Sequence, residues 1–369
     1  MVAPNPVSLR PTVSVIVPAR NEEASLGACL ESLVGQGGVS FEVIVVDDGS
    51  TDRTRKIAGS VPGVRVIEPG PLPLGWSGKS NAVIAGARTA TGEWLLFTDA
   101  DTVHLPGSLV RSLAEAQKED AALLSYSPEQ EVRGFWEKAV MPVIFAELAS
   151  TFRPSDVSDP AAPAAAANGQ YILVKRDAYD AVGGHAAVAT SLLEDVALAR
   201  LVKASGRRIF FRFGGDAVRT RMYRSFAQLR EGWIKNLALL FNSPLRLAAW
   251  RLVEFFAIVA AAILAVASGL SGHTGQCMIA ALAAIGSYAL FLGRIRKAHF
   301  SWDANVLALV GLPMFSYLLL RSWLAHQRGK VSWKGREYAP AASNQVSSHT
   351  LQQPTLGPKD ENGLSHAQS

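Results

Sequence analysis

Short apolar runs alternate with helical patterns over residues 12–215, and no other feature of the chain restricts its fold as strongly. Runs rich in β-branched and other apolar residues occupy 12–18, 41–48, 64–68 and 93–99. Helical patterns fill the intervals, at 25–34, 50–61 and 79–89. Strands and helices that alternate at this pace predict a mostly parallel sheet with helices on both faces.

Acidic residues follow two of these predicted strands, at the point where each strand ends. Asp47 and Asp48 close the second strand, and Asp99 and Asp101 close the fourth. Ligands of parallel α/β sheets bind beyond the carboxyl ends of the strands. Paired carboxylates suit Mg²⁺, which also takes oxygens from substrate phosphates. Each pair alone also fits an ordinary polar turn, so the prediction of a cation site depends on finding both pairs at one edge.

Two histidines lie near these acids, and either is a further candidate metal ligand. His104 follows Asp101 by three residues, although a histidine in a loop or helix cap is the favoured interpretation of that position. His185 stays open. The two cysteines, Cys29 and Cys277, lie far apart, so we expect no disulfide and no cysteine-based metal site, as is usual on a reducing cytosolic face.

Composition and the N-terminal segment narrow the class of protein. The net charge is +5 without a run of five or six like charges, which gives no support to nucleic acid as a partner. Residues 1–10 form a leader without the charged and apolar regions of a signal peptide. We therefore expect a catalytic-type domain over residues 11–247 on the side of the membrane where it is made.

The apolar residues concentrate in a membrane region over 248–325. Three hydrophobic segments fall at about 252–272, 276–293 and 304–324, and a spanning helix needs ~20 residues. Glu254 interrupts the first segment and Pro313 lies in the third. Basic residues at 294, 296 and 297 follow the second segment, so the positive-inside rule predicts a cytosolic N-terminal domain in a multi-pass protein of the cytoplasmic membrane.

The third segment leaves two alternatives. Residues 326–340 form a basic juxtamembrane segment, which three spans would place outside, against the rule. The third segment therefore either bends back into the membrane or spans with the rule violated. Residues 341–369 are rich in Ser, Gln, Asn and Pro and are predicted to be disordered. Residues 135–150 are apolar but too short and charged to span, so they either lie on the membrane surface or pack in the core.

Four motifs in a fixed order resemble those of the family 2 glycosyltransferases, which have the GT-A fold. The motifs are Pro18-Ala-Arg-Asn21-Glu22, Asp47-Asp48-Gly-Ser50, Asp99-Ala-Asp101 and Glu194-Asp195. The resemblance covers about 11–241, close to two-thirds of the chain. The stretches at 75–82, 182–199 and 331–338 are similar to a membrane-bound branch that includes ceramide glucosyltransferase and carotenoid and hopanoid-associated glycosyltransferases.

The resemblance implies a fold and a set of donor contacts. It implies a GT-A nucleotide-diphospho-sugar transferase domain followed by transmembrane helices. Asp48 would bind the nucleotide base, and the turn containing Pro18, Asn21 and Glu22 would lie beside it. Lys79 would lie near the diphosphate. Asp99 would contact the ribose or the metal, and Asp101 would ligate Mg²⁺ or Mn²⁺.

The resemblance also implies the chemistry. Asp195 would act as general base on the acceptor hydroxyl, with Glu194 beside it at the start of a helix, where the dipole stabilises carboxylates. One displacement would invert the anomeric centre. The expected reaction moves a hexose from a nucleotide-diphosphate sugar, with UDP as the expected nucleotide, to a hydroxyl of a lipid at the cytosolic membrane face. The expected partners are therefore a nucleotide sugar, a lipid acceptor and the bilayer, in glycolipid biosynthesis.

One motif departs from the family, and alternatives follow. Processive and ceramide-type members carry Q/R-x-x-R-W, whereas here Gly232 replaces the arginine before Trp233, and Arg230 is the candidate substitute. Candidate acceptor or membrane-proximal residues are Gln170, Arg230, Trp233, Trp333 and Arg336, and each tryptophan is equally a candidate interfacial anchor. The alternatives are a polyprenyl-phosphate or polysaccharide glycosyltransferase, a non-glycosyl Mg-nucleotide transferase and a non-enzymatic membrane protein.

Overall fold

A seven-stranded sheet forms the centre of the N-terminal domain. The computed structural model describes residues 11–333 and 336–338, with side chains through 331. The strand order is β3-β2-β1-β4-β8-β6-β9, and every strand is parallel to its neighbours except β8, which is antiparallel to both. The strands are β1 (Val13–Ala19), β2 (Phe41–Asp47), β3 (Val64–Ile67), β4 (Trp94–Phe97), β6 (Leu123–Ser127), β8 (Ile172–Lys175) and β9 (Ile209–Phe213). The predicted mostly parallel sheet is confirmed.

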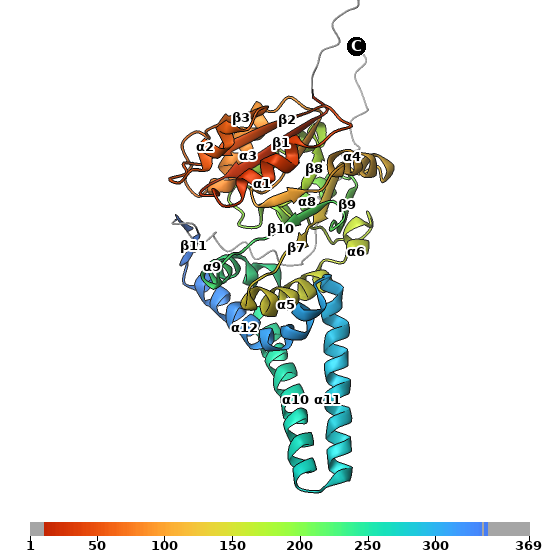
Figure 1. Ribbon diagram of the computed structural model, residues 1–369. Coiled ribbons are helices and arrows are strands. Elements are labelled where there is room, and N and C mark those ends of the chain that lie inside the picture. The colour runs from red at the N-terminus through yellow and green to blue at the C-terminus, as the bar shows by residue number, and fades with distance from the viewer. Residues whose placement is uncertain (1–10, 334–335, 339–369) are drawn as a thin grey trace, which may run out of the picture.

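Helices cover both faces of this sheet and enclose two hydrophobic cores (Figure 1). One face carries α1 (Leu26–Val34), α2 (Thr54–Ser60) and α4 (Ser108–Lys118); the other carries α3 (Gly78–Thr89), α7 (Arg176–Ala181) and α8 (Glu194–Ala204). Side chains alternate along a strand. Accordingly, Val15 and Val17 enter the first core and Ile16 enters the second. The strand–helix alternation in the sequence thus reflects burial on both faces.

A small second sheet holds the segment that follows β4. Its order is β5-β10-β7, with β5 (Thr102–His104), β10 (Val218–Thr220) and β7 (Glu129–Gln130). The Thr220 hydroxyl donates a 3.1 Å hydrogen bond to the backbone oxygen of Asp101. The backbone of the acidic pair is therefore fixed from both sides, by β4 and by β10.

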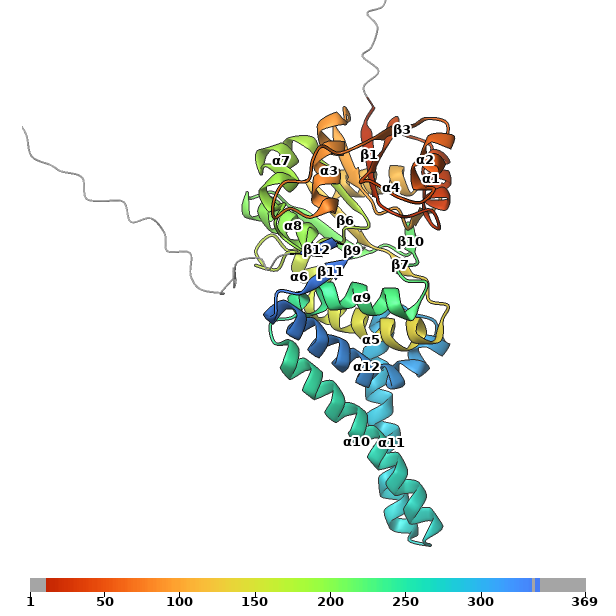
Figure 2. The same ribbon diagram turned by 90° about the vertical axis from the view of Figure 1, so that its left-hand side faces the viewer.

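A layer of helices lies below the catalytic domain (Figures 1 and 2). It contains α5 (Phe135–Thr151), α9 (Phe226–Asn236) and α12 (Trp302–Gln327), which share a third hydrophobic core. The apolar segment predicted at 135–150 is α5, and its Val140 and Ile144 side chains are fully buried in that core. Of the two interpretations of this segment, the structure supports packing in the core.

A two-helix hairpin extends beyond this layer. It consists of α10 (Pro244–Leu270) and α11 (Thr274–Ile295). The helices α10 and α12, and the helical stretch from Thr274 to Ala298, are each long and apolar enough to cross a membrane. The shorter elements are α6 (Pro154–Ser158), the 3₁₀ helices η1 (Gly184–Val188), η2 (Leu237–Leu240) and η3 (Arg296–Ala298), and the hairpin of β11 (Val331–Trp333) and β12 (Arg336–Tyr338).

Candidate active site

A cavity of about 480 Å³ opens at the carboxyl edge of the large sheet, between the strand ends and α9. Its lining brings together groups that are distant in sequence. From the catalytic domain it includes Pro18, Asn21, Glu22, Asp48, Lys79, Asp99, Asp101, Gln170 and Glu194. From α9 it includes Gln228, Glu231, Gly232, Lys235 and Asn236. All of the residues predicted to bind the donor therefore line one cavity.

The loops after β1 and β2 are tied together by side-chain hydrogen bonds. Asn21 has a positive φ of 52°, a conformation that Asn tolerates better than most residues. Its amide oxygen accepts a 2.8 Å hydrogen bond from the backbone N–H of Thr51, and its own N–H donates to Ser50. Arg20 donates to the backbone oxygen of Asp48 at 2.6 Å. These bonds place Glu22 and Asp48 on the same wall of the cavity.

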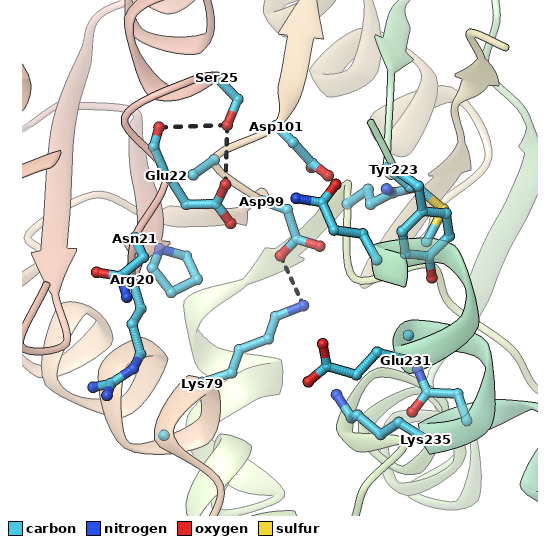
Figure 3. Close-up of a pocket in the computed structure, with 18 of the residues that line it drawn as sticks. Arg20, Asn21, Glu22, Ser25, Lys79, Asp99, Asp101, Tyr223, Glu231 and Lys235 are labelled. Carbon is cyan, nitrogen blue, oxygen red and sulfur yellow. Dashed lines mark hydrogen bonds and ion pairs between the residues drawn. The ribbon is translucent and has the colours of Figure 1, made fainter. Parts of the chain in front are cut away.

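Lys79 occupies the centre of the charged part of the site (Figure 3). Its Nζ lies 2.7 Å from Asp99 Oδ1 and 3.4 Å from Glu194 Oε1, and its side chain is 35% exposed. Burial lowers the pKa of Lys79, but the carboxylates of Asp99 and Glu194 raise it by more, so that the net pKa lies above the ordinary value. Lys79 thus links the residues predicted to hold the metal with those predicted to perform the chemistry.

Asp195 lies behind Glu194, beside a small void of about 10 Å³ that Lys79 and Asp99 also line. Its Oδ2 accepts a 3.0 Å hydrogen bond from the backbone N–H of Gly169, and its Oδ1 accepts one from Val196. Burial and the neighbouring Glu194 carboxylate raise the pKa of Asp195 to about 6. A carboxylate with a pKa near 6 is suited to accept a proton near neutral pH.

Glu194 is held in its charged form. Burial raises the pKa of Glu194, but the positive charges of Lys79 and Lys235 and the first backbone N–H groups of α8 lower it by more. Two adjacent carboxylates with opposite pKa shifts are a common arrangement for dividing structural and acid–base roles. Here the geometry assigns the charge-pairing role to Glu194 and leaves the proton-accepting role to Asp195.

The two candidate histidine ligands both have hydrogen-bond partners in the protein. His104 is 3% exposed, its Nε2 lies 3.1 Å from the Thr98 hydroxyl, and burial lowers its pKa to about 3. His185 is held by the Tyr179 hydroxyl at 3.0 Å, and burial lowers its pKa to about 4. His104 is absent from the lining of the cavity, as expected for a core histidine, whereas His185 borders the small void.

The donor set for a metal consists of two carboxylates. Within the described residues, no group of three or more His, Cys, Asp or Glu side chains is arranged to hold a metal ion. Asp99 and Asp101 both line the cavity, and Figure 3 shows both carboxylates directed into it. Mg²⁺ is commonly bound by one or two carboxylates with substrate phosphates completing the shell. The residues present therefore fit a divalent cation that binds together with a diphosphate.

The α9 wall corrects the expectation for Arg230. Arg230 is exposed and does not belong to the cavity lining, so it does not replace the missing arginine. Trp233 is 4% exposed and donates from Nε1 to the sulfur of Met141, which makes it a core residue rather than an interfacial anchor. Adjacent positions on a helix differ by about 100°, so Gly232 faces the cavity while Trp233 faces the core.

The reason for Gly232 is the ring of Tyr223. A Cβ at position 232 would overlap the Tyr223 hydroxyl and ring, which occupy the space beside the helix. An arginine is therefore excluded here by packing. Lys235 lies one turn further along the same face of α9, and burial lowers its pKa although Glu194 raises it.

Sequence analysis did not identify Tyr223, Glu231 or Lys235 as site residues. All three line the cavity and are labelled in Figure 3. For Glu231 and Lys235 a signal existed, because residues four apart share a face of a helix. For Tyr223 there was none, since its contact with Gly232 is set only by the tertiary structure.

The remaining acceptor-site candidates are placed as follows. Gln170 is 4% exposed, donates to the Thr220 hydroxyl at 3.4 Å and accepts from Gln130 at 3.3 Å. Trp333 and Arg336 oppose one another in the β11–β12 hairpin. Their side chains lie outside the described part of the structure, so their predicted roles stay predictions.

Known proteins share both the sequence and the fold. Residues 14–182 match the model of the family described as glycosyl transferase family 2. Over 338 residues the chain is 29% identical to 4,4'-diaponeurosporenoate glycosyltransferase of Staphylococcus aureus (strain USA300), covering 89% of this chain and 88% of that protein.

Two solved structures illustrate the similarity in fold. A mannosyltransferase from Pyrobaculum calidifontis, in complex with GDP-Man and Mn²⁺, aligns with a TM-score of 0.47 and 19% identity over 86% of this chain and 87% of that one. Glucosyl-3-phosphoglycerate synthase from Mycobacterium tuberculosis, with Mn²⁺, UDP and product, aligns with a TM-score of 0.41 and 22% identity over 62% and 79%.

Proposed function

Because this chain carries a family 2 glycosyltransferase domain and is a glycosyltransferase, we propose that it moves a hexose from a nucleotide-diphosphate sugar to a membrane lipid. UDP is the proposed nucleotide, and the proposed acceptor group is a hydroxyl of a carotenoid-type lipid. The similarity to a diaponeurosporenoate glycosyltransferase over most of both chains supports this acceptor class. The family match also replaces the non-glycosyl and non-enzymatic alternatives.

One observation carries the mechanism: Lys79 bridges Asp99 and Glu194, with Asp195 directly behind them. In the proposed complex Asp48 binds the base and Lys79 binds the diphosphate. A divalent cation held by Asp101 and Asp99 would offset the charge of the leaving nucleotide. Among the described residues, the arrangement supplies one anionic wall for the cation and one cationic side chain for the phosphates.

Proton transfer is assigned to Asp195. The Gly169 N–H holds its carboxylate in place, and the raised pKa allows it to accept the proton of the acceptor hydroxyl. The acceptor oxygen then attacks the anomeric carbon while the bond to the diphosphate breaks. Because this is one displacement, the product has the inverted configuration. We further propose that the reaction takes place at the cytosolic face of the cytoplasmic membrane.

The test measures sugar transfer by membranes that contain the full-length protein. Radiolabelled UDP-hexoses are supplied with carotenoid, polyprenyl-phosphate and glycerolipid acceptors, and products are separated by mass. We expect a hexose mass shift on the carotenoid-type acceptor. If polyprenyl phosphate alone is modified, the acceptor assignment is wrong, and if no UDP-hexose is consumed with any acceptor, the donor assignment is wrong.

A matched pair of variants tests the base. Asp195→Asn should lower turnover by about 10²–10⁴-fold, the usual contribution of a positioned base, while UDP binding by calorimetry stays near that of the wild type. Asp180→Asn, at an exposed position on α7, makes the same chemical change away from the site and should leave turnover unchanged. Near-normal turnover of Asp195→Asn would show that another group takes the proton.

A further inference from the structure

The three apolar helices have very different surroundings. In their most hydrophobic windows only 6% of the residues of α10 and 11% of those of the Thr274–Ala298 stretch are buried, against 50% for α12. Figures 1 and 2 agree that α12 lies in the layer with α5 and α9, whereas α10 and α11 extend beyond it. Length and composition alone treat the three helices as equivalent, and the packing does not.

The buried face of α12 is joined to the catalytic domain along its length. A Cβ at Gly311 would overlap the backbone of Ala139 in α5, which shows how closely the two helices approach. Near its start, Asp303 pairs with Lys138 at 2.6 Å. Near its end, His326 Nε2 lies 2.8 Å from the backbone oxygen of Lys235 in α9. A helix with such contacts at both ends has both ends at the level of this layer.

The helices α5 and α9 that flank α12 carry charges which are unfavourable in a lipid interior. Glu137 on α5 pairs with Arg221 at 3.0 Å, and α9 presents Glu231 and Lys235 to the cavity. Charged groups within a bilayer core are rare because their desolvation is costly. The layer that contains α12 therefore belongs at or above the membrane interface.

A cluster of four charges marks where the hairpin leaves this layer. Glu147 of α5 pairs with Arg251 of α10 at 2.9 Å and also with Arg294 of α11. Glu254 pairs with the same two arginines, at 2.9 and 2.6 Å. Glu254, which interrupted the first predicted span, is thus one member of a charge-balanced cluster at the base of the hairpin.

Beyond this cluster the hairpin is free of charge. Residues 255–293 contain no Asp, Glu, Lys or Arg. The 16 residues from Phe255 to the end of α10 correspond to about 24 Å at the helical rise of 1.5 Å per residue, close to the thickness of a bilayer core. The exposed side chains along it, including Phe256, Ile263, Met278 and Leu290, are apolar.

The exposed side of α12 is a narrow apolar strip. Val310, Tyr317 and Leu320 are its exposed large side chains along the middle of the helix, and their spacings of seven and three place them on one face. Arg321 lies beside the Tyr317 ring, 5.9 Å from its centre. One apolar strip with a basic flank is the pattern of a helix that lies in the plane of a membrane interface.

We propose that the chain crosses the membrane twice, through α10 and α11, and that α12 lies in the interface with its apolar strip on the lipid. Both alternatives for the third hydrophobic segment, spanning and re-entry, are then replaced by a third arrangement. The basic residues at 294–297 and 328–330 lie on one side, as the positive-inside rule requires.

This arrangement also gives the cavity a fixed place relative to the lipid. Lys235 lines the cavity with its side chain, and its backbone contacts α12. One helix, about 10 Å in diameter, therefore separates the cavity from the helix at the interface. An acceptor that stays in the membrane can bring its reactive group to the cavity without leaving the lipid.

The test compares three single cysteines in the full-length protein with Cys277→Ser, since Cys29 is buried. Ser301→Cys and Gln327→Cys mark the two ends of α12, and Ser271→Cys marks the tip of the hairpin; all three positions are exposed. A membrane-impermeant maleimide is applied to intact spheroplasts and to inverted vesicles. Labelling after detergent treatment establishes that each thiol reacts.

We expect the 301 and 327 positions to be labelled from one side and the 271 position only from the other. If positions 301 and 327 are labelled from opposite sides, α12 spans and the proposal is wrong. If position 271 is labelled from the same side as 301, the hairpin does not cross and the proposal is equally wrong. The comparison uses relative sides, so it is independent of the proposed cytosolic orientation and of the proposed reaction.

Discussion

Removal of the Lys79 charge should shift the pH dependence of sugar transfer, and the size of the shift follows from the geometry. A Cβ built on Gly169 would lie 2.9 Å from Lys79 Nζ and 3.5 Å from Asp195 Oδ2. The two charged atoms are therefore at most about 6 Å apart. At that separation, and with an effective dielectric constant of ~20–40, two unit charges interact by roughly 1.4–2.8 kcal/mol.

The sign of the effect is set by the role of Asp195. A general base works in its deprotonated form, so activity rises with pH through its pKa, which burial and Glu194 raise to about 6. Lys79 favours the charged form of Asp195, and Lys79→Met should raise this pKa further. Because Lys79 is partly exposed, we take the lower end of the energy range, which corresponds to about one pKa unit.

The assay is kcat/KM for the acceptor, measured between about pH 5 and pH 9 at saturating donor. The acid limb of Lys79→Met should lie about one pH unit above that of the wild type, so the variant loses more activity at pH 6.5 than at pH 8.5. Lys118→Met, at an exposed position on α4, is the control and should keep the wild-type limb. An equal loss at every pH would refute the coupling between Lys79 and Asp195.

Three further substitutions test the metal site and two close contacts. Asp101→Ala should lose stimulation by Mg²⁺ or Mn²⁺ and lower turnover by roughly 100-fold or more, measured in metal titrations; an unchanged metal response contradicts its role as a ligand. Gly232→Ala should displace Tyr223 and cost about 1–3 kcal/mol, seen as a lower Tm in detergent, although alanine favours helices; a higher Tm contradicts the packing account. Gly311→Ala should destabilise by a similar amount through contact with the backbone of α5, whereas Gly286→Ala, with open space around it, should not.

The positions of the acidic residues follow from the sequence because parallel strands share a carboxyl edge. Once β2 and β4 are recognised as parallel strands, Asp48 and Asp99 must lie at the same edge of the sheet. The order of the motifs then predicted a single cavity, and the structure places those residues around one. Local patterns were sufficient here, since strand direction and strand end determine the location of each side chain.

The opposite wall of the cavity was not predictable in this way. Arg230 was the expected substitute for the missing arginine, yet Lys235 lines the cavity and Arg230 does not. The choice depends on how α9 is rotated, and that rotation is set by Trp233 in the core and by Tyr223 against Gly232. These contacts join residues from different segments, which no local pattern encodes.

The same division applies to the membrane region. Hydropathy, which depends only on composition, identified three apolar segments, and three helices of suitable length are present. Whether an apolar helix faces lipid or protein depends on what packs against it, and for α12 that is decided by its contacts with α5 and α9. The sequence by itself determined the sheet, the acidic edge and the apolar segments, because each follows from local periodicity. Only the tertiary structure decided the second wall of the cavity and the burial of α12, because both depend on contacts between distant segments.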